Sequence, residues 1–264
     1  MSRKSLNHLR KMKAAKEKIA VLTAYDASFS YALEQAGVDV LLVGDSLGMV
    51  IQGQESTVPV TVEQMIYHTA NVIRGSDNMF VIADLPFMSY ANAQQAIQNA
   101  ARLMAEGGAQ MVKLEGGAVI ADTVEELTAR GIPVCAHLGL LPQSVHRLGG
   151  YFVQGRESEH ADALLADAIR LEEAGADMLV LECVPASLAK TITEQLTIPV
   201  IGIGAGVDCD GQVLVLYDML GLTPGKRPRF SHDFLAETGS IQAALSAYVS
   251  QVKTAVFPSL EQQF

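Results

Sequence analysis

The stretch Glu34-Gln-Ala-Gly-Val-Asp-Val-Leu-Leu-Val-Gly-Asp45 decides the fold, because it recurs as Ala105-Glu-Gly-Gly-Ala-Gln-Met-Val-Lys-Leu-Glu115 and as Glu172-Glu-Ala-Gly-Ala-Asp-Met-Leu-Val-Leu-Glu182. Each copy closes a helical segment with a glycine, the residue best suited to the left-handed conformation after a helix. A nearly unbroken apolar run follows, which is typical of a strand buried on both faces of a parallel sheet. An acidic residue ends each run. The repeat therefore predicts helices alternating with strands, with carboxylates at the strand ends.

The same alternation extends over the rest of the chain. We predict strands near residues 19–24, 38–44, 79–84, 111–115, 133–138, 178–183, 199–203 and 212–217. Helical patterns lie at about 27–36, 62–74, 93–106, 119–130, 158–174 and 186–196, and a last one at about 231–254. Eight strands alternating with helices indicate a single α/β domain over residues 1–264, a (β/α)₈ TIM barrel. A doubly wound open sheet is the alternative, because a sequence does not show closure.

The charge balance narrows the possible partners. The 264 residues include 29 acidic and 19 basic side chains, and the net charge of −10 argues against binding of nucleic acid. Seven cations crowd into residues 1–18. We interpret this start as a solvated extra helix at about 3–16 rather than as an organelle-targeting peptide. No apolar run approaches the length of a membrane span, so we expect no membrane association.

The three cysteines are Cys135, Cys183 and Cys209. Their odd number and wide spacing fit neither a disulfide framework nor a zinc site. We predict buried free thiols in a protein of the reducing cytoplasm.

Candidate chemistry collects at the carboxyl ends of the predicted strands, where barrels of this type build their active sites. The polar residues that fall there are Asp45, Asp84, Lys113, Glu115, His137 and Glu182. Lys113 and Glu115 are two positions apart on one strand, so their side chains point the same way.

Each of these residues also has a purely structural interpretation. Asp45 and Asp84 can cap the helices that follow them, Lys113 and Glu115 can form an ion pair, and His137 can be a satisfied core histidine. Because all of these residues converge on one rim of the barrel, a catalytic or binding role is favoured over the structural roles. Carboxylates packed together repel, a cation relieves the repulsion, and an all-oxygen ligand set favours Mg²⁺. Such a site suits a 2-oxo acid that chelates the metal and forms a stabilised enolate after a carboxylate removes a proton.

Several runs in this order resemble the ketopantoate (3-methyl-2-oxobutanoate) hydroxymethyltransferase family. They are Thr23-Ala-Tyr-Asp26, Gly44-Asp-Ser-Leu-Gly-Met49, Pro59-Val-Thr61, Ala83-Asp-Leu-Pro-Phe-Met88, Lys113-Leu-Glu-Gly-Gly117, His137-Leu-Gly-Leu140, Pro142-Gln-Ser144, Leu181-Glu-Cys-Val-Pro185 and Ile201-Gly-Ile-Gly-Ala-Gly206. The resemblance implies a barrel of the phosphoenolpyruvate/pyruvate-binding superfamily. It also implies transfer of a hydroxymethyl group from 5,10-methylenetetrahydrofolate to 3-methyl-2-oxobutanoate, giving 2-dehydropantoate for pantothenate and coenzyme A. Members are cytoplasmic and commonly form homo-oligomers that are decamers.

The resemblance also implies a role for each candidate residue. Glu182 is the proton acceptor. Mg²⁺ lies among three carboxylates, directly or through water: Asp45, Asp84 and Glu115. The oxo acid meets Asp45, Ser46, Asp84 and Lys113, with His137 assisting at the same rim.

Four positions depart from the pattern expected of the family: Ala136, Leu141, Phe152 and Tyr217. None is a metal or base position, and Phe152 lies in a loop expected to border the folate. Two other functions remain open at this point. One is a Mg²⁺-dependent C–C lyase acting on a 2-oxo or 2-hydroxy acid, and the other is a barrel that binds an oxo acid without turning it over.

Overall fold

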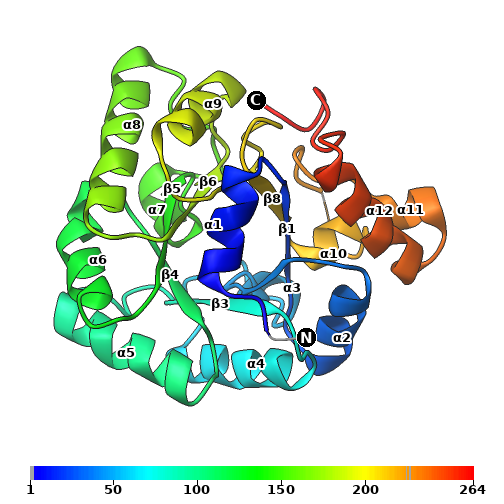
Figure 1. Cartoon of the computed structure of the whole chain (residues 1–264), viewed down its shortest axis with the longest axis horizontal. Helices are drawn as coiled ribbons and strands as arrows, with labels where there is room; N and C mark the ends of the chain where they lie inside the picture. Colours follow the sequence, from blue (N-terminus) through cyan, green and yellow to red (C-terminus); the bar gives the residue numbers. More distant parts are fainter. Residues whose placement is uncertain (1–2, 224, 226) are drawn as a thin grey trace.

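The computed structural model describes residues 3–223, 225 and 227–264. Its strands form one closed parallel barrel in chain order, and β8 pairs with β1 (Figure 1). The strands are β1 Ile19–Thr23, β2 Val40–Val43, β3 Phe80–Asp84, β4 Met111–Glu115, β5 Val134–Gly139, β6 Met178–Glu182, β7 Val200–Ile203 and β8 Gly211–Leu214. Closure excludes the open sheet, so the predicted (β/α)₈ barrel is confirmed.

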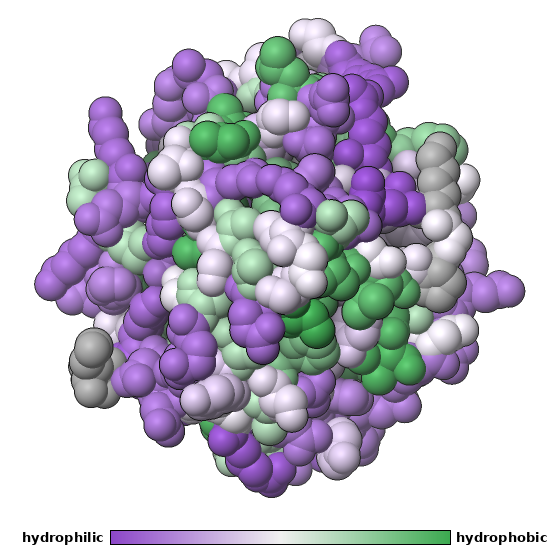
Figure 2. Space-filling view, turned by 90° about the vertical axis from the view of Figure 1, so that its right-hand side faces the viewer, coloured by the Kyte–Doolittle hydropathy of each residue, from purple (hydrophilic) through white to green (hydrophobic). Residues whose placement is uncertain are grey.

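Helices surround the barrel on its outside (Figure 1). They are α1 Leu6–Ala14, α2 Ala27–Gln35, α3 Leu47–Val50, α4 Val62–Arg74, α5 Ala93–Ala105, α6 Ala121–Thr128, α7 Val145–Leu148, α8 Ser158–Glu173, α9 Ala186–Gln195, α10 Leu216–Met219, α11 Phe234–Thr238 and α12 Ile241–Lys253, with 3₁₀ turns η1 Ala118–Ile120 and η2 Pro142–Ser144. Figure 2 shows the face on the side of α11 and α12. Apolar residues gather near the centre of that face, and hydrophilic residues border them.

The repeated glycines have the conformation that the sequence predicted. Gly37, Gly108 and Gly175 have φ values of 84°, 83° and 97°, which are readily accessible only to glycine. Each lets the chain leave a helix and enter the next strand within a few residues. The strands that follow are almost entirely buried.

Two predicted elements near the carboxyl end were wrong in their bounds. The helix expected at 231–254 is split into α11 and α12, because Gly239 has φ 77° and Ser240 caps the new helix by accepting a hydrogen bond from Ala243 N. The strand expected at 212–217 ends at Leu214 and is followed by the short helix α10. Leu216 N turns away from the sheet to donate to Thr23 Oγ1 at 2.9 Å.

The residue before each even-numbered strand fastens the preceding strand at the amino end of the barrel. In each case its side chain accepts a hydrogen bond from a backbone N–H of the neighbouring strand. The pairs are Asp39 with Ala20 (2.9 Å), Gln110 with Val81 (3.0 Å), Asp177 with Val134 (3.2 Å) and Asp210 with Val200 (2.9 Å). We call these four side chains the strand clamps. They satisfy N–H groups that the barrel ladder leaves without a partner.

Helix α1 lies across this amino end of the barrel, in front of the strands in Figure 1. Lys4, just before the helix, and two residues of α1 contact the four strand clamps. The contacts run from Lys4 Nζ to Asp39 (2.9 Å), from Gln110 Nε2 to Lys4 O (3.1 Å), from Arg10 to Asp177 (2.6 Å) and from Lys13 to Asp210 (2.7 Å). The helix is shorter than the predicted range 3–16, and Ser5 occupies its N-cap position.

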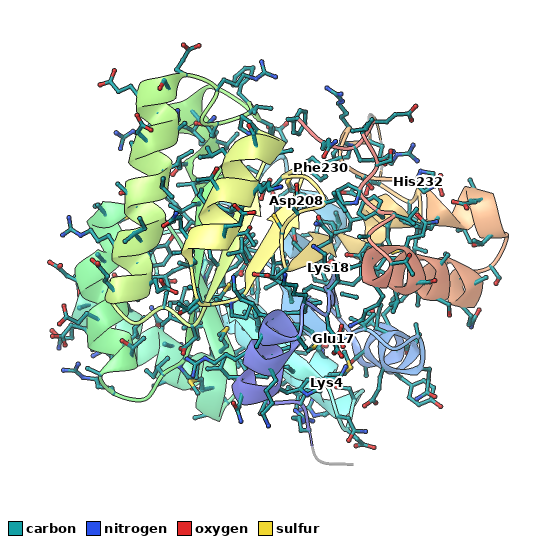
Figure 3. All side chains as sticks on the ribbon, turned by 45° about the horizontal axis from the view of Figure 1, so that its top comes forward. Lys4, Glu17, Lys18, Asp208, Phe230 and His232 are labelled. Carbon is teal, nitrogen blue, oxygen red and sulfur yellow. The ribbon has the colours of Figure 1, made fainter. Side chains whose placement is uncertain are left out.

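The predicted extra helix is confirmed, but only part of its charge is left to solvent: Arg10, Lys11 and Lys16 are exposed, whereas Lys4 and Lys13 are partly buried against strand clamps. Besides those on the strand clamps, Arg3 donates to the carbonyls of Ser76 and Asp77. Lys18, labelled in Figure 3, donates to Val207 O and Cys209 O. The cluster of cations neutralises the acidic amino end of the barrel.

The apolar side of α1 yields a first prediction. Leu9 is fully buried, so Leu9→Ala should destabilise the fold by about 2–5 kcal/mol through lost burial and the cavity left behind. Denaturant unfolding checks the size of the effect. Lys11→Ala on the exposed side of the same helix is the matched control and should change stability little. Equal midpoints for the two variants would show that α1 does not stabilise the barrel.

The three cysteines are buried free thiols, as predicted. Burial raises the pKa of Cys135 and of Cys209 to about 12, so both stay protonated near neutral pH. Within the described residues, every helix is too short or too polar to cross a membrane.

Candidate active site

A cavity of about 890 Å³ opens at the carboxyl ends of the strands. All seven residues that the sequence singled out line it: Asp45, Ser46, Asp84, Lys113, Glu115, His137 and Glu182. Most of these residues lie at or near the carboxyl ends of strands, because the parallel strands of a barrel all end at the same rim. The register pairs Asp84 with Lys113 and Glu115 with His137 on adjacent strands.

Lys113 sits at the centre of the charged residues on the cavity floor. Its Nζ lies 3.1 Å from Asp84 Oδ1, 3.9 Å from Glu115 Oε1 and 3.3 Å from His137 Nδ1. Burial lowers the pKa of Lys113, but the surrounding carboxylates outweigh burial and raise it above its ordinary value. The lysine is therefore a permanent cation inside the barrel.

His137 connects the buried cluster to Glu182. Its Nδ1 lies 3.4 Å from Glu115 Oε1 and its Nε2 lies 3.3 Å from Glu182 Oε2. Burial and the charge of Lys113 lower the pKa of His137, while its bonds to the two glutamates raise it, with a net value of about 8. Burial also raises the pKa of Glu115, but the contacts with His137 and Lys113 lower it overall. The glutamates thus favour the protonated form of His137, and His137 and Lys113 favour the carboxylate form of Glu115.

Asp45 and Asp84 form a second group on the same floor. The backbone N–H of Asp45 donates to Asp84 Oδ2 at 3.1 Å, while Asp84 Oδ1 faces Lys113 without a directed hydrogen bond. Burial raises the pKa of both aspartates, and repulsion by Asp84 and Glu115 adds to the rise at Asp45. A further cation at this point would stabilise both charges.

These carboxylates suit Mg²⁺ held partly through water. Within residues 3–223, 225 and 227–264, no three His, Cys, Asp or Glu side chains are arranged to bind a metal ion directly. Mg²⁺ commonly takes only one or two protein carboxylates and keeps several waters. The buried Asp84 Oδ1 without a hydrogen bond and the unfavourable ionisation of Asp45 and Asp84 fit that mode of binding.

Gln143 is a site residue that sequence reasoning missed. It lies on η2 after β5 and is buried. Its Nε2 donates to Asp45 Oδ2 at 2.8 Å and to Leu85 O at 3.0 Å, and its backbone N–H donates to Glu115 Oε2 at 3.1 Å. Gln143 thus bridges two of the carboxylates. The run Pro142-Gln-Ser144 was quoted for the family resemblance, but a glutamine neither titrates nor usually ligates a metal, so it drew no role.

Tyr90 fixes the orientation of this glutamine. Its hydroxyl donates to Gln143 Oε1 at 2.6 Å and so leaves Nε2 to face Asp45. The same hydroxyl lies 3.3 Å from Glu115 N, which donates to it. The amide and the phenol form one hydrogen-bonded support beneath the carboxylates.

Removal of this support gives a second prediction. Gln143→Leu removes the Nε2 donor from Asp45 Oδ2 and from Leu85 O, which should lower the free energy of unfolding by about 1–3 kcal/mol. Chemical denaturation measures the loss. Gln98→Leu is the control, because Gln98 is exposed on α5 and the same change there removes no buried hydrogen bond. An unfolding midpoint for Gln143→Leu equal to that of Gln98→Leu would contradict the bridging role.

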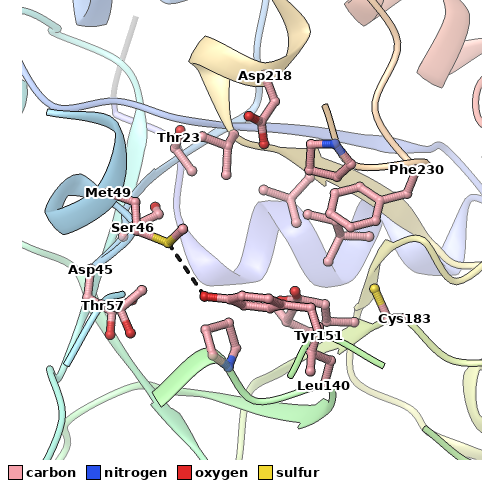
Figure 4. Close-up of a pocket in the computed structure, with 18 of the residues that line it drawn as sticks. Thr23, Asp45, Ser46, Met49, Thr57, Leu140, Tyr151, Cys183, Asp218 and Phe230 are labelled. Atoms are coloured by element: carbon pink, nitrogen blue, oxygen red, sulfur yellow. Dashed lines mark hydrogen bonds between the residues drawn. The ribbon is translucent and has the colours of Figure 1, made fainter. Parts of the chain in front are cut away.

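Aromatic side chains form the rim of the cavity. In Figure 4 the Tyr151 ring lies across the opening, and its hydroxyl donates to Met49 Sδ at 3.7 Å. Phe152 also lines the cavity and is 59% exposed, so the loop expected beside the cofactor does border the site. Ser46 shares a 2.8 Å hydrogen bond with Tyr25 at the cavity wall.

The chain is similar over nearly its whole length to proteins of one known family. A family model described as ketopantoate hydroxymethyltransferase matches residues 3–260. The 3-methyl-2-oxobutanoate hydroxymethyltransferase of Nitrosococcus oceani is 66% identical over 261 residues, which cover 99% of each chain. The chain belongs to the ketopantoate hydroxymethyltransferase family.

Other members of the family agree with this assignment. The 3-methyl-2-oxobutanoate hydroxymethyltransferase of Alkalilimnicola ehrlichii is 60% identical, covering 98% of this chain and 94% of that one. The enzyme of the same name from Shewanella loihica is 57% identical over the full length of both chains. The resemblance stated from the sequence is confirmed, and the chain is an enzyme of the hydroxymethyltransferase family.

Solved structures of other proteins share the barrel fold of this chain. Phosphonopyruvate hydrolase in complex with oxalate and Mg²⁺ has a TM-score of 0.63 at 13% identity, covering 99% of this chain and 93% of that one. 2,3-Dimethylmalate lyase in its triclinic crystal form has a TM-score of 0.54 at 17% identity, covering 74% and 70%. At these identities the comparison shows the shared fold.

Proposed function

We propose that the protein transfers a hydroxymethyl group from 5,10-methylenetetrahydrofolate to 3-methyl-2-oxobutanoate, giving 2-dehydropantoate for pantothenate and coenzyme A synthesis. Family membership over nearly the whole chain supports this reaction. The observation that carries it is the floor of the cavity, where a buried cation, a carboxylate facing open space and paired aspartates converge.

Lys113 and Ser46 suit the carboxylate and the developing oxyanion of the oxo acid. The ammonium of Lys113 is buried and already oriented by Asp84, so it needs little rearrangement to meet an anion. The Ser46 hydroxyl is held by Tyr25 at 2.8 Å. Asp45, Asp84 and His137 would complete the contacts around the small acid.

Glu182 is the best-placed proton acceptor. Its side chain is 14% exposed, against 3% for Glu115 and 4% for Asp84, so it faces the cavity most directly. His137 Nε2 lies 3.3 Å from Glu182 Oε2 without a directed hydrogen bond, and the other carboxylate oxygen is left for the C3 proton of the substrate. A positioned carboxylate in a dry site contributes about 10²–10⁴-fold to proton transfer.

Asp45 and Asp84, with Glu115 through water, would hold Mg²⁺ beside Lys113. When bound, the ion supplies Lewis acidity that polarises the keto group and makes the adjacent C–H more acidic. Gln143 holds Asp45 and Glu115 in place for this purpose.

Hydrogen exchange tests the proposal one step at a time. Protein incubated in D₂O with Mg²⁺ and 3-methyl-2-oxobutanoate should exchange the C3 hydrogen, as followed by NMR. EDTA should stop the exchange, and restored Mg²⁺ should recover it. Added 5,10-methylenetetrahydrofolate should then yield 2-dehydropantoate. The absence of both exchange and product at saturating Mg²⁺ would overturn the proposal.

The alternative of a C–C lyase has no specific observation in its favour. The lyase structure shares the barrel fold at low identity, whereas the whole chain matches the hydroxymethyltransferases. Folate dependence separates the two, because a lyase would consume its acid without a one-carbon donor.

We further propose that the protein works in the cytoplasm as a homo-oligomer, a decamer by resemblance, without nucleic-acid or membrane partners. The apolar area in Figure 2 is the kind of surface that subunits bury against each other. Light scattering on the eluted protein gives the oligomer mass, and a monomer at micromolar concentration would exclude this assembly.

A further inference from the structure

The cavity has a fifth buried carboxylate that the proposed chemistry does not use. Asp218 lies on α10, just after β8, and is 6% exposed. It lines the same cavity as Lys113 and Glu182. Figure 4 shows its side chain pointing into the cavity, with Phe230 beside it and Tyr151 across from it.

Within the described part of the chain, the carboxylate of Asp218 uses only part of its capacity to accept hydrogen bonds. Oδ1 accepts a hydrogen bond from Thr223 Oγ1, the one hydrogen bond to this carboxylate from the described part of the chain. Arg227, the described arginine whose charge acts on Asp218, has its Nη1 3.4 Å from Asp233 Oδ2. Burial raises the pKa of Asp218, and the charge of Glu182 adds to the rise. A buried carboxylate that retains acceptor capacity is costly unless a ligand supplies donors.

The cavity is also larger than a small oxo acid needs. Its volume of about 890 Å³ is at the upper end of the range for drug-sized ligands. Apolar side chains also line the cavity, among them Ile203, Val213, Val215 and Phe230, the last beside Asp218 in Figure 4. A flat heterocycle with two adjacent N–H donors on one edge would match a carboxylate set in such a cavity.

We propose that Asp218 binds the 2-amino-4-oxopyrimidine edge of the one-carbon donor. The pterin ring of a tetrahydrofolate presents its N3–H and 2-amino groups side by side, which is the two-donor arrangement that a carboxylate accepts. Phe230 then packs against the ring. Because Asp218 and Glu182 line one cavity, the ring held at Asp218 brings its methylene carbon toward the acid held at Lys113. This inference rests on the proposed function and names where its second substrate binds.

The substitution Asp218→Asn separates this role from the oxo-acid chemistry. Asparagine keeps the shape and the acceptor for Thr223, but it turns an N–H₂ group toward the pterin donors. We expect the KM for 5,10-methylenetetrahydrofolate to rise about 10–100-fold, as for loss of a charged hydrogen bond. C3–H exchange of 3-methyl-2-oxobutanoate in D₂O, which needs no folate, should keep its wild-type rate. Asp208→Asn, an exposed aspartate outside the cavity (labelled in Figure 3), is the control and should alter neither value.

A second measurement uses the wild-type protein and so does not depend on the variant folding. A tetrahydrofolate analogue in which a methyl group replaces the 2-amino group should bind about 10–100-fold more weakly than tetrahydrofolate. In Asp218→Asn the two compounds should bind alike, because the interaction is already lost. Equal affinities in the wild type, or an unchanged folate KM in the variant, would overturn this inference alone. A wild-type protein that uses no methylenetetrahydrofolate would instead overturn the proposed function.

Discussion

Glu182→Gln is expected to lose C3–H exchange of 3-methyl-2-oxobutanoate by about 10²–10⁴-fold or more, the contribution of a positioned base. Glutamine matches glutamate in shape but accepts no proton at neutral pH. Binding of the oxo acid should change little, because Lys113 and Ser46 remain in place. NMR exchange rates in D₂O and calorimetric binding of the acid measure the two effects separately.

A second readout of the same variant comes from His137. Its contact with Glu182 helps to raise its pKa to about 8, so the variant should titrate at lower pH than the wild type. Glu194→Gln makes the same chemical change on the exposed surface of α9 and serves as the control. Wild-type exchange in Glu182→Gln would mean that another group removes the proton.

Lys113→Met should produce the largest loss of stability among single changes in the cavity. Its ammonium lies 3.1 Å from Asp84 Oδ1 and 3.9 Å from Glu115 Oε1. Removing one member of a buried charged group costs about 3–5 kcal/mol, or roughly 6–20 °C in Tm for a chain of this size. Thermal unfolding checks this value, and turnover should fall with it. Lys190→Met on exposed α9 is the matched control.

The loss in Lys113→Met should depend on pH and on Mg²⁺. Without the ammonium, the pKa of Asp84 in the folded state rises further above its unfolded value, and the pKa of Glu115, which the wild type holds below its ordinary value, also rises. The folded variant then binds more protons than the folded wild type, so its deficit should be smaller at about pH 5 than at about pH 8. Mg²⁺ should raise its Tm more than that of the wild type. A deficit independent of both would show that Lys113 does not balance the carboxylates.

The local repeat explains how much of the site could be predicted. Asp45, Glu115 and Glu182 end the three copies of the repeat, and the barrel brings such strand ends together whatever else the chain does. Gln143 and Asp218 carried no comparable pattern. Gln143 acts through a contact with Asp45, a residue far away in sequence. Asp218 follows the eighth strand, which ends at Leu214 and not at the predicted residue 217.

The partners of the cations around α1 could not be predicted for the same physical reason. The helical spacing of Leu6, Leu9 and Met12 predicts the helix but not the groups that its cations contact. Their partners are the strand clamps, which only the closed barrel gathers at one end. Local periodicity predicts elements well, but it does not predict which distant side chains close around them.

The strand clamps also bear on the order in which the protein can be completed. Lys13 and Asp210 lie 197 positions apart, so α1, which is synthesised before every strand of the barrel, meets its last clamp only when the eighth strand begins to emerge. Until then, Lys13 lacks this carboxylate partner. A helix that precedes all the strands is thus among the last elements to dock completely. A nascent chain halted before residue 210 would carry a helix whose final partner does not yet exist.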